Sequence, residues 1–101
     1  MSEARRLAIA GEFTIYRAAE LRDALLAVMA PGASDVTIDL HEVSDIDSAG
    51  VQLLMAARCT ALASGTALTL AEASEPVRNV LQLFDLAAFF GDALPPAGAL
   101  A

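Results

Sequence analysis

Residues 36–51, VTIDLHEVSDIDSAGV, decide the fold expected of this chain. The first five residues alternate apolar and polar side chains, which predicts a β-strand with one apolar side. A polar loop, His41–Asp47, follows and contains two apolar residues, and a helix is expected to open near Ser48. The stretch therefore predicts a strand, a loop and a helix in succession, which is the repeating unit of an α/β domain.

Similar segments lie on both sides of this stretch. Further strands are expected at Leu7–Ala10 and Ala67–Ala71, and helices at about 17–30, at 48–63 and after Ser74. Glycine or proline marks the ends of these helices, at Pro31-Gly32, at Ser64-Gly65 and at Pro76 in a first turn. Residues 86–90 are apolar and are expected to form a last edge strand or a packed tail.

The alternation of strands and helices predicts the architecture. Right-handed crossovers between such segments give a mostly parallel sheet of about four strands covered by helices. The 101 residues fit one domain. We expect a single α/β domain over residues 1–101, with a core at about 6–90 and a frayed tail at 94–101.

Composition narrows the class of partner. The chain has 13 Asp and Glu against 6 Arg and Lys, so its formal net charge is −7. Such a surface repels the phosphates of nucleic acids and anionic lipid headgroups. No stretch approaches the ~18–20 apolar residues of a spanning helix, so direct membrane insertion is not expected. Cys59 is the single cysteine, and the N-terminal residues lack a secretory core, which together favour the cytoplasm.

The segment Asp47-Ser48-Ala49-Gly50 carries the most informative chemistry. Ser48 is expected to be the N-cap of the second helix, with its hydroxyl accepting a backbone N–H. A nucleophilic serine needs a general base, and the one histidine, His41, has no reason to lie beside Ser48. We therefore expect no catalytic residue and no enzymatic activity.

Other candidate sites have simpler interpretations. The carboxylates of Asp39, Glu42, Asp45 and Asp47 match no EF-hand spacing, and solvated loop charges explain them without a metal ion. The chain lacks the glycine-rich patterns that cradle phosphates, so no cofactor is expected. Other side chains are expected to pack: Cys59 on its helix, Tyr16 against the sheet edge, and Phe84, Phe89 and Phe90 in the core.

The start of the second helix also suits a regulatory modification. Free N–H groups and the partial positive charge of a helix N-terminus stabilise a phosphoryl group. Phosphorylation of Ser48 would add a charge of about −1.5 to −2 to a surface that is already acidic. A partner packed on this helix start would then be repelled, so the position suits a switch.

The order of these segments resembles a STAS domain, the fold of bacterial anti-sigma factor antagonists. The resemblance covers about residues 6–90, and its most specific parts are Asp39-Leu40, Val43, Ile46, Asp47–Val51 and the strand entry at Gly65–Leu70. It implies that Ser48 is the phosphoacceptor. It also implies that the partner is both an anti-sigma factor and a serine kinase, which binds the unphosphorylated form.

The resemblance and the helix geometry together predict a partner-binding surface. This surface is the loop Ser44–Ser48 with the exposed face of the helix at about residues 49–60. Its members are Ser44, Asp45, Asp47, Ser48, Ala49, Gly50 and Gln52, with Arg58 as a further polar contact by helical position.

Two features differ from the family pattern. In Gly11-Glu12-Phe13-Thr14, Thr14 replaces the aspartate of the switch-type members, and the chain has no room for an additional N-terminal strand. A missing strand leaves a sheet edge exposed, which allows a homodimer. Residues 14–21 are similar to small STAS proteins that accompany chemotaxis-type histidine kinases. Another similar branch is the small STAS subunit of bacterial phospholipid-transport ABC systems, which docks on the ATPase subunit.

Overall fold

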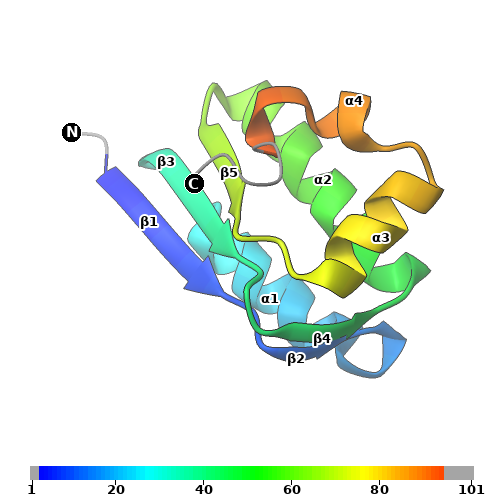
Figure 1. Cartoon of the computed structure of the whole chain (residues 1–101). Coiled ribbons are helices and arrows are strands. Elements are labelled where there is room, and N and C mark those ends of the chain that lie inside the picture. The colour runs from blue at the N-terminus through cyan, green and yellow to red at the C-terminus, as the bar shows by residue number, and fades with distance from the viewer. Residues whose placement is uncertain (1–2, 95–101) are drawn as a thin grey trace.

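Three parallel strands form the main sheet of the molecule (Figure 1). The computed structural model describes residues 3–94. The main sheet has the order β1 (Glu3–Ala8), β3 (Ala33–Asp39) and β5 (Ala67–Ala71). Two shorter strands, β2 (Gly11–Phe13) and β4 (Val43–Ile46), pair in parallel as a second sheet. The helices are η1 (Ile15–Arg17), α1 (Ala18–Val28), α2 (Ser48–Ser64), α3 (Glu75–Leu83), α4 (Ala87–Phe90) and η2 (Gly91–Ala93).

The small sheet continues the hydrogen bonding of the main sheet around a bend. Between the two sheets, the N–H of Ile9 donates to the carbonyl of Asp39 at 3.0 Å, and the N–H of Gly11 donates to that of Glu42 at 2.9 Å. β2 and β4 therefore lie at the carboxyl end of β1 and β3 and turn away from their direction (Figure 1). The loops that lead into the helices α1 and α2 are thus brought together at one end of the molecule.

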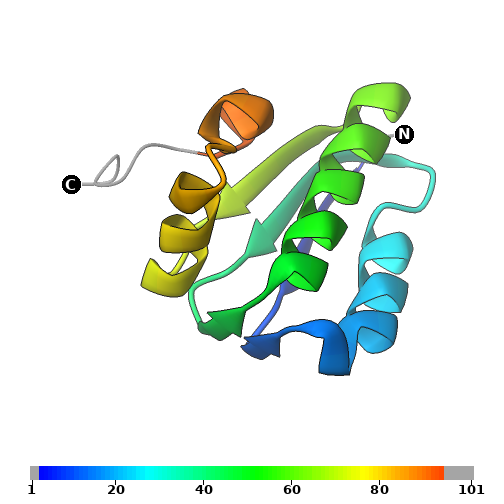
Figure 2. The same cartoon turned by 90° about the vertical axis from the view of Figure 1, so that its right-hand side faces the viewer.

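The helices cover one face of the main sheet. The chain moves in one direction across this sheet, from β1 to β3 to β5, so crossovers of the same hand place α1 and α2 on the same side. Figure 2 shows α1, α2 and α3 in front of the strands. We call the opposite side the open face; by strand alternation and register it carries Ala4, Arg6, Ala8, Asp35, Thr37, Asp39, Ala67, Thr69 and Ala71, none of which is buried.

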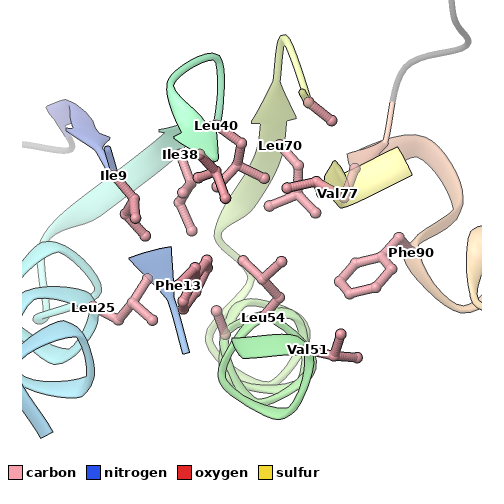
Figure 3. Packing of buried hydrophobic residues seen from close by; sticks show 14 of the residues in the cluster. Ile9, Phe13, Leu25, Ile38, Leu40, Val51, Leu54, Leu70, Val77 and Phe90 are labelled. Carbon is pink, nitrogen blue, oxygen red and sulfur yellow. The ribbon is translucent and has the colours of Figure 1, made fainter. Parts of the chain in front are cut away.

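The hydrophobic core lies between the sheet and the helices (Figure 3). Ile38 and Leu70 point from the strands toward Leu54 of α2, and Phe13 of β2 and Phe90 of α4 fill the two sides. Gly50 lets α2 approach β2 closely, because a Cβ built there would lie 2.3 Å from the carbonyl oxygen of Phe13. The core thus holds the start of α2 directly against the small sheet.

The α/β class, the parallel pairing and the order of the helices are confirmed, and three details of the prediction need correction. The sheet strands number five in two sheets rather than about four in one. Val43–Ile46 is a strand and not a loop; its two buried residues are separated by two exposed ones, and the pairing of β2 with β4 has a register shift, so the usual alternation is absent. Residues 86–90 form no edge strand, because α4 occupies them and buries Phe90.

Two further predictions concern the sheet edge and the C-terminal tail. The expectation that the chain has no room for an additional N-terminal strand is wrong, because two strands, β1 and β2, precede the first helix, and β1 begins at Glu3 rather than at Leu7. β1 is nevertheless an outer strand of the main sheet, so a sheet edge is present. The frayed tail at 94–101 lies outside the described residues except for Leu94.

Candidate functional site

Asp47, and not Ser48, is the N-cap of α2. Its backbone is extended, with φ −120° and ψ −172°, and its Oδ1 accepts hydrogen bonds from the N–H groups of Ala49 at 2.9 Å and Gly50 at 3.2 Å. Ser48 is the first residue of the helix. Aspartate and serine are equally good caps, and a carboxylate also interacts favourably with the positive end of the helix dipole. The predicted cap is therefore wrong by one residue.

The second oxygen of Asp47 ties the preceding loop to the same helix. Oδ2 accepts a hydrogen bond from the N–H of Ile15 at 3.0 Å, so one carboxylate joins η1 to the first turn of α2. The hydrogen bond from Ile15 is the largest of the influences that hold the pKa of Asp47 below its ordinary value; the N–H groups of Gly50 and Ala49 add to it. Asp47 is accordingly ionised at neutral pH.

Ser48 presents its hydroxyl to solvent. The residue is exposed, and within residues 3–94 its hydroxyl makes no hydrogen bond. The expectation of free helix N–H groups is wrong for Ala49 and Gly50, because both donate to Asp47. A phosphoryl group on Ser48 would therefore meet the carboxylate of Asp47 and compete with it for these donors.

The remaining predicted contact residues fall into two sets. Ser44 and Asp45 are exposed on β4, and Gln52 is exposed one helical turn after Ser48. Ala49 is half-buried, while Gly50 is buried against Phe13 and cannot touch a partner. Gly50 thus has a packing role, and the other predicted residues lie together at the start of α2.

Two large apolar side chains beside this helix start were not predicted as surface. Ile15 is 63% exposed and Tyr16 is 88% exposed, so the predicted packing of Tyr16 on the sheet edge is wrong. Arg17 holds their 3-10 turn in place, since its guanidinium donates to the carbonyls of Ala10 at 2.6 Å and Glu12 at 2.9 Å. The sequence signal that could have indicated this surface was the pair Ile15-Tyr16 itself, two large side chains directly after Thr14.

Thr14 adds no polar contact to this surface. The residue is 5% exposed, and its Oγ1 has no hydrogen-bond partner in the described part of the chain. An aspartate at this position would bring a negative charge to the loop, whereas the threonine brings none.

Exposed carboxylates lie on the small sheet that precedes the helix start. Glu12 of β2 and Asp45 of β4 are opposite each other in the register of the small sheet, and both are exposed. Glu42 is exposed nearby in the chain. Over residues 3–94, no group of three or more His, Cys, Asp or Glu residues is arranged to hold a metal ion. The surface is therefore acidic without forming a metal-binding cluster.

A shallow apolar groove, open to solvent, runs between α1 and α2. Its lining is Arg22, Leu25, Leu26, Met29, Leu53, Ala56, Ala57 and Thr60. Cys59, on the outer side of α2, is exposed and not packed as predicted. Within residues 3–94, no helix has the length and apolar character needed to cross a bilayer.

Comparisons with known proteins agree with this geometry. The family model described as "Mlab, STAS domain" matches residues 1–95. The chain belongs to the STAS domain family. No curated protein sequence matches it at a significant level.

Solved STAS-type structures share the fold. A sulfate transporter family protein from Wolinella succinogenes superposes with a TM-score of 0.75 at 20% identity, covering 93% of this chain and 79% of that one. The anti-sigma factor antagonist SpoIIAA in its unphosphorylated form gives 0.73 at 21% identity, covering 96% and 82%. The STAS domain of a SulP transporter from Vibrio cholerae gives 0.67 at 20%, covering 97% and 78%. The resemblance inferred from the sequence is thus confirmed for family and fold.

Proposed function

We propose that this STAS domain is a non-catalytic regulatory module of the cytoplasm that binds a protein partner at the start of α2 and is switched by phosphorylation of Ser48. The surface in question consists of Glu12, Ile15, Tyr16, Ser44, Asp45, Asp47, Ser48 and Gln52, and is called the docking surface below. The observation that carries the proposal is the Ser48 hydroxyl, which is exposed and makes no hydrogen bond because Asp47 is the cap. A kinase can reach it without unfolding the helix.

The chemistry of the site supports release by phosphorylation. A phosphoryl group carries about −1.5 to −2 charges at pH 7 and would stand beside the ionised Asp47. Repulsion and competition for the N–H groups of Ala49 and Gly50 would loosen the link from Asp47 to Ile15. The added charge would also need to be desolvated under any partner. Each effect weakens docking of the modified form.

The family resemblance suggests a partner for the switch, an anti-sigma factor that is also a serine kinase. Such a partner recognises the unmodified surface and phosphorylates the serine that it covers. Binding is expected to involve Ser44, Asp45 and Gln52 around Ser48, while Ala49 contributes through its half-buried position.

A second candidate is a docking subunit of an ABC transporter, held permanently on an ATPase subunit. Thr14 favours this reading, because it is buried and uncharged where the switch-type members carry an aspartate. In that case the same surface binds its partner, but Ser48 is not modified. A STAS component that accompanies a chemotaxis-type histidine kinase would use the surface in the same way.

The intact mass of the protein, expressed in its own host without a tag, separates these functions. Peptide mapping then locates any modification. One added phosphate on Ser48, in a fraction that varies with growth condition, is the result expected for the switch. A stable ATPase partner and an unmodified mass in every condition would favour the docking subunit and reject the switch.

A further inference from the structure

We infer that Tyr16 and Ile15, flanked by Glu12 and Asp45, form an anchor that binds an arginine-bearing, apolar patch on the protein partner. This inference rests on the proposed function, because it describes the chemistry of the partner that the docking surface accepts. It concerns residues at the edge of that surface and is independent of whether Ser48 is modified.

The apolar part of the anchor is large and held in place. Tyr16 is 88% exposed and Ile15 is 63% exposed, both on the short η1 turn. Asp47 accepts a hydrogen bond from the N–H of Ile15, and Arg17 donates to two carbonyls before the turn. Side chains presented from a backbone that is already ordered lose less entropy on binding, and tyrosine is enriched among the residues that dominate interfaces.

The charged part of the anchor is a pair of like charges. Glu12 and Asp45 are register partners in the parallel β2–β4 pairing, and both side chains are exposed, so two carboxylates lie on neighbouring strands. Neither carboxylate forms an ion pair in the described part of the chain. A cation from another molecule would be attracted to both carboxylates.

The cation that interacts electrostatically with Glu12, Arg17, is already engaged by other partners. The guanidinium of Arg17 pairs with Glu20 at 3.1 Å and donates to the carbonyls of Ala10 and Glu12. Its pKa is raised above the ordinary value mainly by the hydrogen bond to Glu20, and the charge of Glu12 contributes less. Asp45, on the other strand, has no such neighbour among the ion pairs of the structure.

Arginine fits this combination better than lysine or a metal ion does. Its planar guanidinium stacks on an aromatic face and bonds carboxylates with two parallel hydrogen bonds. A lysine offers a point charge without the flat face. The described carboxylates do not form a metal-binding group, and nucleic acids and anionic lipids are repelled by the same negative charges. A protein surface with arginine beside apolar side chains is therefore the occupant.

The test is a titration of the ¹⁵N-labelled protein with the peptide acetyl-Arg-Leu-Arg-Leu-Arg-amide, followed by amide chemical shifts. The largest changes are expected at Glu12, Tyr16 and Asp45. The affinity should fall at least about threefold when lysine replaces arginine and be lost in 1 M salt, where the Debye length is about 3 Å. Changes spread over all acidic residues, or centred on the α1–α2 groove, would overturn the inference.

Variants make the test specific. Tyr16→Ala, and Glu12→Gln combined with Asp45→Asn, should each weaken peptide binding at least about threefold. Asp35→Asn, on the open face, removes one charge and should leave binding unchanged. The doubly neutralised variant should unfold at close to the wild-type temperature, because both side chains are exposed. Weaker binding combined with unchanged stability cannot come from partial unfolding.

The outcomes separate this inference from the proposed function. In one outcome, Ser48→Asp releases a partner protein in the host, Tyr16→Ala retains it, and the peptide shifts amides outside Glu12, Tyr16 and Asp45. The anchor is then wrong, and the switch at Ser48 is supported. In the other outcome, the peptide binds at Tyr16 but Ser48→Asp retains the partner protein. The anchor is then supported, and the switch at Ser48 is wrong.

Discussion

The open face of the sheet and the docking surface both meet solvent, yet they are built differently. On the open face the side chains are short, and the long one, Arg6, pairs with Asp39 at 2.8 Å. On the docking surface two large apolar side chains are exposed, and the opposed carboxylates of Glu12 and Asp45 have no ion pair within residues 3–94. The open face therefore has no exposed large apolar side chain, and its one long side chain has an ion-pair partner.

This difference in side-chain composition indicates which of the two solvent-exposed surfaces binds a partner. Parallel sheets are usually covered on both faces, so the open face alone suggests a missing layer. Its small and polar residues show the opposite, since burial of Thr and Asp side chains without partners is unfavourable. Exposed large apolar residues beside exposed carboxylates, by contrast, are typical of an interaction site.

The largest expected effect compares the two faces of one strand. Ile38 is fully buried on the helix side of β3, and Thr37 lies on the open face. Ile38→Ala should lower the free energy of unfolding by about 2–5 kcal/mol because it leaves a cavity in the core. Thr37→Ala should change it by less than about 1 kcal/mol. Urea unfolding measures both, and similar losses would mean that the open face is covered.

A second effect concerns the contact between α2 and the small sheet. Gly50→Ala places a methyl group 2.3 Å from the carbonyl oxygen of Phe13 and 2.9 Å from Cγ1 of Ile46. A loss of about 1–3 kcal/mol is expected from this overpacking. Gly65→Ala is the control, because nothing lies within 4 Å and only the positive φ of 70° opposes it, at about 1 kcal/mol. A smaller loss at residue 50 than at residue 65 would contradict the close approach.

The sequence predicts α2 well because both of its ends have strong signals. A residue of the Asp47-Ser48 pair had to cap it, and Gly65 ends it in the left-handed conformation, φ 70°. The choice between Asp47 and Ser48 depends on a contact from Ile15, which lies 32 residues earlier in the chain. Such a long-range hydrogen bond leaves no local trace in the sequence.

The orientation of Tyr16 and the strand β4 were missed for similar reasons. A 3-10 turn precedes α1, and its tighter winding changes the phase of the side chains, so that Tyr16 points to solvent. In β4, Val43 and Ile46 are both buried although they are three residues apart, since the pairing with β2 is irregular. Hydrophobic spacing predicts regular elements and fails where a register shift or a change of helix type intervenes.

A smaller effect is expected at the cap of α2. Asp47→Ala removes three hydrogen bonds and should lower the melting temperature, whereas Asp47→Asn retains an oxygen acceptor and should lower it less. The folded pKa of Asp47 lies below its unfolded value, so its contribution is complete above the unfolded pKa of about 3.9. The difference between wild type and Asp47→Ala should therefore vanish as the pH falls through the folded pKa. A difference that persists at still lower pH would exclude the carboxylate as its source.

The smallest effect is expected on the open face. Arg6 is largely exposed, so Arg6→Gln should change the free energy of unfolding by about 0–1 kcal/mol despite the short distance to Asp39. The hydrogen bond from the N–H of His41 is the main influence that lowers the pKa of Asp39, and it remains in the variant. Thermal melts at two salt concentrations check this, and a large loss would show that the open face depends on its ion pair.

The central claim is tested most directly by partner retention on two serine variants. Ser48 and Ser44 are both exposed and lie four residues apart, on α2 and β4. Ser48→Asp and Ser44→Asp add the same charge to the docking surface, and Ser48→Ala adds none. If Ser48 is the switch, partner protein isolated from the host should be lost from Ser48→Asp, retained by Ser48→Ala and weakened much less by Ser44→Asp. Equal retention by Ser48→Asp and Ser48→Ala would contradict the account.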